Sequence, residues 1–142
     1  MNLIGILLLA AALPTTNIKL ANGKTLTVEV AAPGIEAGQG LAGRNSIAPD
    51  SGIVLVYLGD TRTKYNLMGY PGPVDILYLD EKKTIINLRE NAAPCRIANC
   101  GYDSIWSHRY AVQLAAGTVK RYNIHAGDVL AFDLPPGKIN LP

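Results

Sequence analysis

Residues 17–30, NIKLANGKTLTVEV, decide the fold class of this chain of 142 residues. Apolar side chains occupy every second position on both sides of Asn22-Gly23. The alternating residues are Ile18, Leu20, Leu26, Val28 and Val30. A period of two is typical of a strand with one buried face, and Asn-Gly favours the tight turn in which both central residues need a positive φ. The stretch therefore predicts a β-hairpin.

The same kind of signal recurs downstream, with short runs of apolar and β-branched residues separated by turn residues. Strands are predicted over residues 53–59, 73–79, 84–88, 109–117 and part of 125–134, and short helices within 33–44 and 117–124. Many strands at short spacing indicate an all-β sandwich or barrel. We therefore expect a single, mostly β domain, antiparallel and barrel-like or a sandwich, with one or two short helices.

The N-terminus differs from the rest of the chain because residues 3–12 are all apolar. The run ends in Ala10-Ala11-Ala12, a small-residue pattern typical of signal-peptide cleavage, although no Lys or Arg precedes it. It is shorter than the roughly 20 residues that span a bilayer, so no transmembrane span is expected. We interpret residues 1–14 as a signal peptide, or alternatively as an apolar arm that packs on a partner, and residues 15–142 as the β domain.

The composition limits the class of partner. Charged residues make up 17% of the chain, against roughly 25% in an average soluble domain, and the net charge is only +2. The longest basic run is Lys82-Lys83, whereas nucleic-acid binders usually carry a basic stripe. Nucleic acid is therefore not expected as a partner. A thin charged surface fits a small molecule, a sugar or a protein, including a homo-oligomer or a larger assembly.

Cys95 and Cys100 are the two cysteines of the chain. A structural zinc site needs four ligands, usually as two close pairs, but His108 and His125 lie seventeen residues apart. The spacing is not that of a C-x-x-C redox motif, and no local signature marks a nucleophile. We expect a structural disulfide, as is common in exported proteins, and neither a metal nor another cofactor.

Six short stretches, spread in order between Leu26 and Phe132, resemble the small exported bacterial and archaeal proteins of the domain of unknown function 192 family. They are residues 40–44, 49–52, 73–80, 94–95, 110–117 and 124–128. The resemblance implies a compact, largely β fold and no established activity. One stretch departs from the family pattern, since residues 65–70 read YNLMGY where the family usually has W-M-K-N-T. A site built on that motif would be altered here.

Asp75 and Arg44 are candidate binding residues. Asp75 lies in the predicted strand 73–79, and both faces of that strand are otherwise apolar. A buried carboxylate needs a partner, and the planar guanidinium of Arg44 suits it. Bonds to backbone N–H groups are the alternative. The pair would be either a structural ion pair or a polar anchor in a cleft.

A second candidate group combines aromatic and basic side chains within nine residues: Tyr102, Trp106, His108, Arg109 and Tyr110. Aromatic faces beside polar groups suit a sugar or a stacked base, so Tyr102, Trp106 and Arg109 are candidate binding residues. The structural alternative is that Trp106 covers the end of the barrel while Tyr110 joins the core.

Together these features favour a non-catalytic binding or assembly domain that is secreted, periplasmic or part of the cell envelope. The alternatives are a carboxylate-centred hydrolase, and a structural subunit of a larger particle that uses the N-terminal arm. For the hydrolase, Asp75 and Asp80 do not form a local acid pair, because residues five apart on a strand point to opposite faces.

Overall fold

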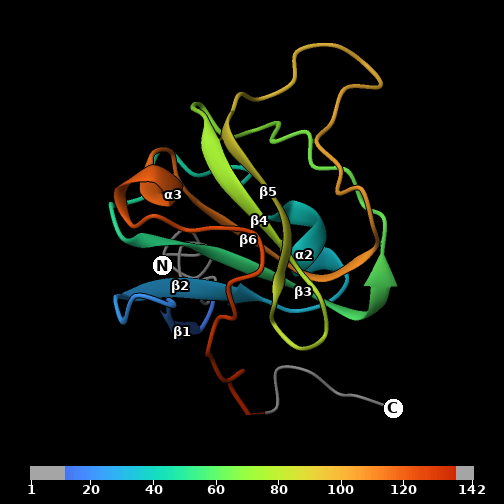
Figure 1. Ribbon diagram of the computed structural model, residues 1–142. Helices are drawn as coiled ribbons and strands as arrows, with labels where there is room; N and C mark the ends of the chain where they lie inside the picture. Colours follow the sequence, from blue (N-terminus) through green and yellow to red (C-terminus); the bar gives the residue numbers. More distant parts are fainter. Residues whose placement is uncertain (1–11, 137–142) are drawn as a thin grey trace, which may run out of the picture.

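A computed structural model describes residues 12–136 (Figure 1). Within this range the chain forms one six-stranded sheet in the order β1-β2-β3-β6-β4-β5. The strands are β1 (Thr15–Lys19), β2 (Thr25–Ala31), β3 (Ser51–Thr61), β4 (Val74–Leu79), β5 (Ile85–Ala92) and β6 (His108–Ala115). The two short helices are α2 (Ile35–Gln39) and α3 (Thr118–Arg121). The prediction of a mostly β domain with short helices is confirmed.

The hairpin predicted from residues 17–30 is also confirmed, since β1 and β2 pair antiparallel across a turn that contains Gly23 at φ 91°. Two details differ from the expected antiparallel barrel. Strands β2 and β3 are parallel, because the chain crosses over through α2 between them. The sheet is also not closed, since β1 and β5 form its two edges and do not pair with each other.

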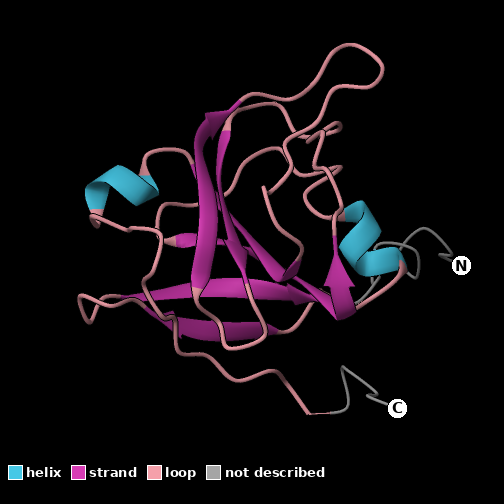
Figure 2. Ribbon diagram, turned by 45° about the vertical axis from the view of Figure 1, so that its right-hand side comes forward, coloured by secondary structure: helices cyan, strands magenta, loops and turns pink. Residues whose placement is uncertain are grey.

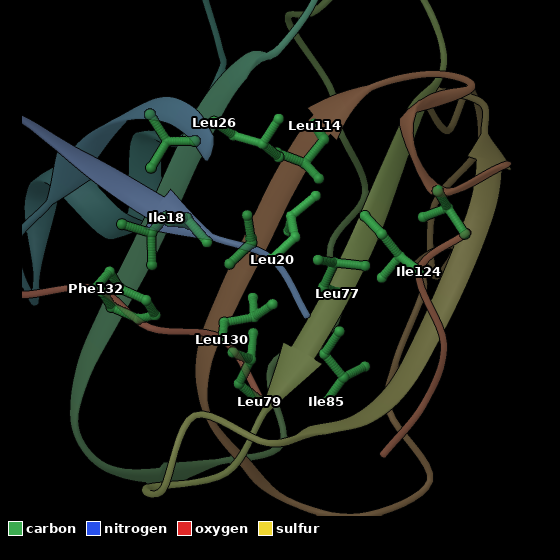
Figure 3. Packing of buried hydrophobic residues seen from close by; sticks show 14 of the residues in the cluster. Ile18, Leu20, Leu26, Leu77, Leu79, Ile85, Leu114, Ile124, Leu130 and Phe132 are labelled. Carbon is green, nitrogen blue, oxygen red and sulfur yellow. The ribbon is translucent and has the colours of Figure 1, made fainter. Parts of the chain in front are cut away.

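Both faces of the sheet are covered by apolar side chains. The first cluster lies inside the curl of the sheet, where residues such as Ile18, Leu77 and Phe132 point toward one another (Figure 3). The second cluster lies on the opposite face, beneath α2 and the long loops 62–73 and 93–107, and includes Ile53, Ile76 and Tyr78. Figure 2 shows α2 and α3 on opposite sides of the sheet. The central strands are therefore buried on both faces.

The last predicted strand, within residues 125–134, is not a strand in the structure. This segment instead passes between the two edges of the sheet and bonds to each over a few residues only. Lys19 and Ala131 exchange two backbone hydrogen bonds of 2.8 and 3.1 Å, while Leu130 N–H donates to Lys83 O at 3.0 Å. Its alternating apolar residues, Leu130 and Phe132, are buried in the first cluster, which explains the strand-like sequence pattern.

Asp75 is fully buried, as predicted. The prediction that Arg44 is its partner is wrong. The Asp75 carboxylate accepts three backbone hydrogen bonds, from Asn91 N–H at 3.0 Å, Gly117 N–H at 3.1 Å and Val119 N–H at 2.9 Å. These bonds tie the end of β5 and the first turn of α3 to the middle of the sheet. Arg44 lies elsewhere in the fold.

Arg44 follows α2 and forms a bidentate ion pair with Glu29 of β2. Both side chains are partly exposed, at 30% and 26%. The physical reason for the error is that backbone N–H groups at a strand end and a helix start already supply Asp75 with donors, so no guanidinium is required.

We expect the substitution Asp75→Ala to lower the free energy of unfolding by about 3 to 5 kcal/mol. The reason is that it leaves three N–H groups without their acceptor in a buried setting, and each such group costs about 1 to 3 kcal/mol. Denaturant unfolding measures the loss. Asp103→Ala, which removes a surface ion pair to Arg89, is the control and should cost less than about 1 kcal/mol. A similar small loss for both variants would contradict the structural role of Asp75.

Candidate functional site

The candidate site is a cavity of about 380 Å³ on the second-cluster face of the sheet, between α2, β3 and the loop 62–73. This volume falls in the range of about 300–1,000 Å³ that is usual for small-molecule sites. Its walls expose about as much polar as apolar surface. The lining residues include Gly38, Gly40, Tyr57, Lys64, Tyr65, Tyr70 and Gln113. A concave site of this size with mixed walls can hold a small organic ligand.

Gln113 forms part of the cavity lining from the middle of β6. It pairs with Ile53 of β3 on one side and Ile76 of β4 on the other, and both isoleucines are fully buried. Gln113 itself is only 3% exposed, and its side-chain amide makes no hydrogen bond to other residues of the described part of the chain. The amide is not fully enclosed, because the fully buried side-chain atoms without a partner in the described chain are Ser104 Oγ and His108 Nδ1. It therefore stays accessible from the cavity.

Gly40 leaves room above this amide. A Cβ atom at Gly40 would lie 3.8 Å from Oε1 of Gln113 and 3.9 Å from a methyl group of Leu55. Gly40 has φ 52°, a conformation that residues with side chains rarely adopt. The end of α2 therefore bends away without placing a side chain over Gln113.

A chain of three hydrogen-bonded rings leads from the cavity into the second cluster. Tyr65 Oη–H donates to Tyr57 Oη at 2.9 Å, and the Tyr65 oxygen lies 2.6 Å from Nε2 of His108. In the arrangement in which Tyr65 donates to Tyr57, Nε2 of His108 donates to Tyr65. Nδ1 of His108 is buried without a partner. The Tyr57 side chain also shares a hydrogen bond with Thr63, which lines the cavity.

Burial sets the charge state of this chain. His108 is fully buried, and desolvation lowers its pKa from 6.5 to about 4, so the imidazole is neutral at neutral pH. Burial also raises the pKa values of Tyr57 and Tyr65, which therefore stay protonated. The three groups form a neutral polar network. They provide hydrogen bonds to a ligand but no charged nucleophile.

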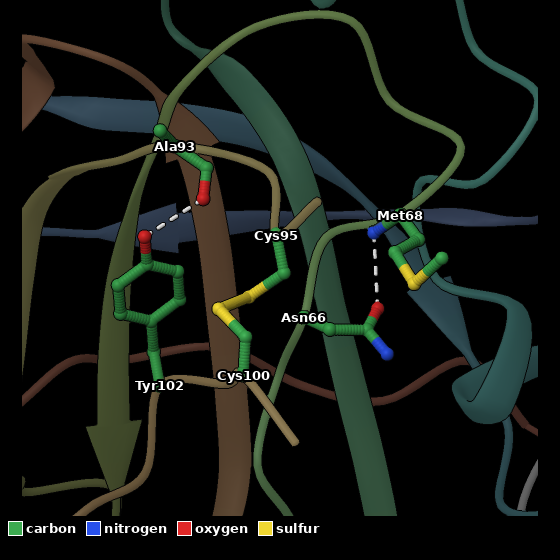
Figure 4. The surroundings of a disulfide bond; sticks show 6 residues. All are labelled: Asn66, Met68, Ala93, Cys95, Cys100 and Tyr102. Atoms are coloured by element: carbon green, nitrogen blue, oxygen red, sulfur yellow. Dashed lines mark hydrogen bonds between the residues drawn. A yellow bond between two sulfur atoms is a disulfide. The ribbon is translucent and has the colours of Figure 1, made fainter. Parts of the chain in front are cut away.

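Cys95 and Cys100 form a disulfide with a Cα–Cα distance of 5.7 Å, within the range that such bonds require. The disulfide closes residues 95–100 within the loop 93–107, and Figure 4 shows it beside Asn66 of the loop 62–73. Cys95 N–H donates to Asn66 O at 2.8 Å, and Tyr65 and Tyr102 exchange two backbone hydrogen bonds of 3.0 and 2.9 Å. Tyr102 Oη–H donates to Ala93 O at 2.8 Å. The bonded loop therefore supports the cavity wall that contains Tyr65.

The residues predicted to bind from the sequence do not converge. Trp106 is 60% exposed and does not cover an end of the sheet, whereas Tyr110 packs on the first cluster, edge to face with Phe132. Arg109 pairs with Asp60, and Tyr102 lies beneath the guanidinium of Arg89. Within the described residues, no hydrogen bond, ion pair or ring contact joins any two of these candidates: Arg44, Asp75, Tyr102, Trp106 and Arg109. Their role in binding stays a prediction.

Sequence reasoning missed Gln113, Tyr57 and Tyr65. The sequence signal for Gln113 was weak, namely one polar residue in the otherwise apolar stretch YAVQLAA. The burial of Gln113 depends on β6 lying between β3 and β4. Over residues 12–136, no group of three or more His, Cys, Asp or Glu side chains is arranged to hold a metal ion. None of the helices in that range has the length and hydrophobicity needed to cross a membrane.

Residues 17–132 match the family described as Uncharacterized ACR, which is the domain of unknown function 192 family. The chain belongs to this family. No curated protein matches its sequence. Residues 65–70 are the stretch in which this member of the domain of unknown function 192 family departs from the W-M-K-N-T pattern. They lie at the cavity, where residues 65–68 and 70 all form part of the lining. The family's usual side chains are thus replaced at one wall of the site.

Two solved structures share the fold. A protein from Sinorhizobium meliloti, described as a "putative transcription regulator", is 31% identical with a TM-score of 0.78, over 86% of this chain and 96% of that chain. A protein of unknown function from Novosphingobium aromaticivorans is 17% identical with a TM-score of 0.75, over 87% of this chain and 89% of that chain. The second likeness concerns the fold alone.

We expect the stability of the domain to fall as the pH falls from about 6.5 to about 4. In this window the unfolded chain protonates His108 while the folded protein does not, so the unfolded state binds more protons and gains free energy. The loss attributable to His108 is up to about 3 kcal/mol. Denaturant unfolding at pH 7 and pH 4 measures it in the wild type and in His108→Gln.

The variant should show a smaller difference between the two pH values than the wild type, whatever its absolute stability. His125→Gln, in an exposed turn, is the matched control. An equal pH dependence in wild type and His108→Gln would mean that His108 is not held neutral by the fold.

We also expect the double substitution Cys95→Ser with Cys100→Ser to lower the free energy of unfolding by about 2 kcal/mol, the amount that closing so short a loop provides. Because Cys95 N–H bonds to Asn66 O, hydrogen exchange at Tyr65, Cys95 and Tyr102 should accelerate more than exchange in β3 and β6. Reductant should reproduce the effect in the wild type and leave the double variant unchanged. Two free thiols in unreduced protein would refute the bond.

Proposed function

We propose that this protein is a non-catalytic binding domain of the cell envelope and that its site is the cavity beneath α2. The observation that carries the proposal is Gln113, whose side-chain amide lines the cavity and makes no hydrogen bond within the described protein. A ligand that pairs with this amide replaces its contacts with water. Lys64 is the one charged lining residue of the described chain, and a lining without a facing acid–base pair favours binding rather than catalysis.

The hydrolase alternative has less support. No carboxylate is among the residues that line the cavity in the described part of the chain. Asp75 is fully buried, and its carboxylate accepts hydrogen bonds from three backbone N–H groups. Acid–base hydrolysis usually needs two titratable groups facing one bond. The polar groups that line the cavity instead suit recognition of a neutral molecule.

Export to the periplasm or cell surface is part of the same proposal. The disulfide supports it, because such bonds persist in oxidising compartments. The predicted leader supports it from the sequence, although residues 1–11 lie outside the described residues. An assembly role for the N-terminal arm rests on those same residues. The cavity therefore provides the better-supported site.

A role in transcription regulation, the function in the description of the Sinorhizobium protein, has little support in this chain. Several basic side chains are paired with carboxylates: Lys24, Arg44, Arg89, Arg109 and Arg121. Binding to a phosphate backbone depends on basic groups that are free to replace counterions.

We expect Gly38→Trp to block ligand binding without unfolding the domain. Gly38 lines the cavity, and a Cβ there meets nothing within 4 Å, so the indole can extend across the opening. Thermal unfolding in the presence of sugars, amino acids, nucleobases and short peptides measures binding, since a ligand at about 100 times its Kd stabilises by about 2.7 kcal/mol.

The matched control is Gly59→Trp, an equally open glycine outside the cavity. A compound that binds the cavity should stabilise the wild type and Gly59→Trp but not Gly38→Trp. If every stabilising compound acts equally on all three proteins, the cavity is not the binding site.

A further inference from the structure

We infer that the ligand of the cavity presents a hydrogen-bond donor and an acceptor side by side on a flat group, as a primary carboxamide or the lactam edge of a nucleobase does. This inference rests on the proposed binding function and specifies its ligand class. It follows from three properties of the cavity: the Gln113 amide without a partner in the described protein, the Tyr57 hydroxyl and the distribution of charge.

The Gln113 amide offers both a donor and an acceptor. Its NH₂ group has two protons to donate and its oxygen has two lone pairs, all in one plane. With Ile53 and Ile76 on either side in the sheet, neither half of the amide finds a partner within the described protein. The group that satisfies both halves at once has a donor and an acceptor side by side. The same geometry lets a glutamine form two hydrogen bonds with one base edge.

The Tyr57 hydroxyl adds a second hydrogen-bonding group. It accepts a hydrogen bond from Tyr65 and shares another with Thr63, and both of these residues also line the cavity. These bonds hold the hydroxyl in place at the cavity wall. Because a hydroxyl can donate or accept, it can pair with either half of an amide edge.

The remaining walls limit charge and shape. Lys64 is the one charged side chain among the lining residues of the described chain, so a cationic ligand has no carboxylate to pair with. Tyr57, Tyr65 and Tyr70 contribute aromatic surface. Aromatic rings pack well on flat rings in offset or edge-to-face arrangements. A neutral or singly negative planar ring bearing an amide edge fits these properties.

Two pairs of probes test this inference by NMR titration of the full domain. Nicotinamide is compared with N,N-diethylnicotinamide, which keeps the ring and carbonyl but lacks an N–H donor. Uracil is compared with 1,3-dimethyluracil, in which both lactam edges are blocked. We expect at least one parent compound to shift the signals of Gln113, Tyr57 and Gly40, and its alkylated analogue to bind at least about tenfold more weakly. The pair that responds distinguishes a carboxamide from a nucleobase.

The variant Gln113→Leu adds a second readout. It should weaken binding of the parent compound at least about tenfold and abolish the preference over the alkylated analogue. Its thermal stability should stay close to that of the wild type, because the amide makes no hydrogen bond within the described protein that the substitution would remove. Asn45→Leu, which changes an exposed amide outside the cavity, is the matched control and should keep both affinity and preference.

Equal binding of parent and alkylated probes at the cavity would overturn the inference and leave the binding function standing. Absence of cavity shifts with all four probes would also overturn it, and the separate compound panel with Gly38→Trp then decides whether the cavity binds anything. A preference for the parent probes that persists in Gln113→Leu would assign recognition to another group and refute the role of Gln113.

Discussion

The burial of three central strands on both faces is the constraint on which the other features of this domain depend. Strands β3, β6 and β4 have apolar residues at successive positions, so water must be excluded from each side of the sheet. The sheet curls over its first cluster, with help from α3 and the segment 127–133. The second cluster has no facing sheet, and α2 and two long loops cover it. Irregular cover of this kind leaves a gap, which is the cavity.

Loops with few regular backbone hydrogen bonds need specific interactions to hold them in place. This domain uses a different interaction for each segment. Asp75 holds α3 and the end of β5 through backbone N–H groups. The Tyr65–Tyr102 bridge and the bond from Cys95 N–H to Asn66 O hold the two long loops together, and the disulfide closes residues 95–100 within one of them. The first interaction is buried and structural. The second reaches the cavity wall through Tyr65.

The sequence predicted the features that depend on neighbours along the chain. The β1–β2 hairpin follows from Asn22-Gly23 and its flanking alternation, and the burial of Asp75 follows from its apolar strand. The parallel pairing of β2 with β3 and the hydrogen-bond partners of Asp75 depend on contacts between distant segments, and local pattern does not encode them. Gln113 was missed for the same reason, because only its position between β3 and β4 buries it. The departure at residues 65–70 indicated a changed site, and the structure places it at the cavity wall.

The segment that crosses between β1 and β5 has a consequence for behaviour at high concentration. An open sheet exposes unpaired N–H and C=O groups along its outer strands, and these groups can template pairing with other chains. Here Lys19 of β1, together with Lys83 and Ile85 near the start of β5, is already bonded to residues 127–131. The remaining free edge of β1 is short, since the whole strand has five residues. The crossing segment thus blocks strand-to-strand pairing at the β1 edge, whereas in the described chain β5 is bonded to it at Ile85 alone and offers the longer open edge.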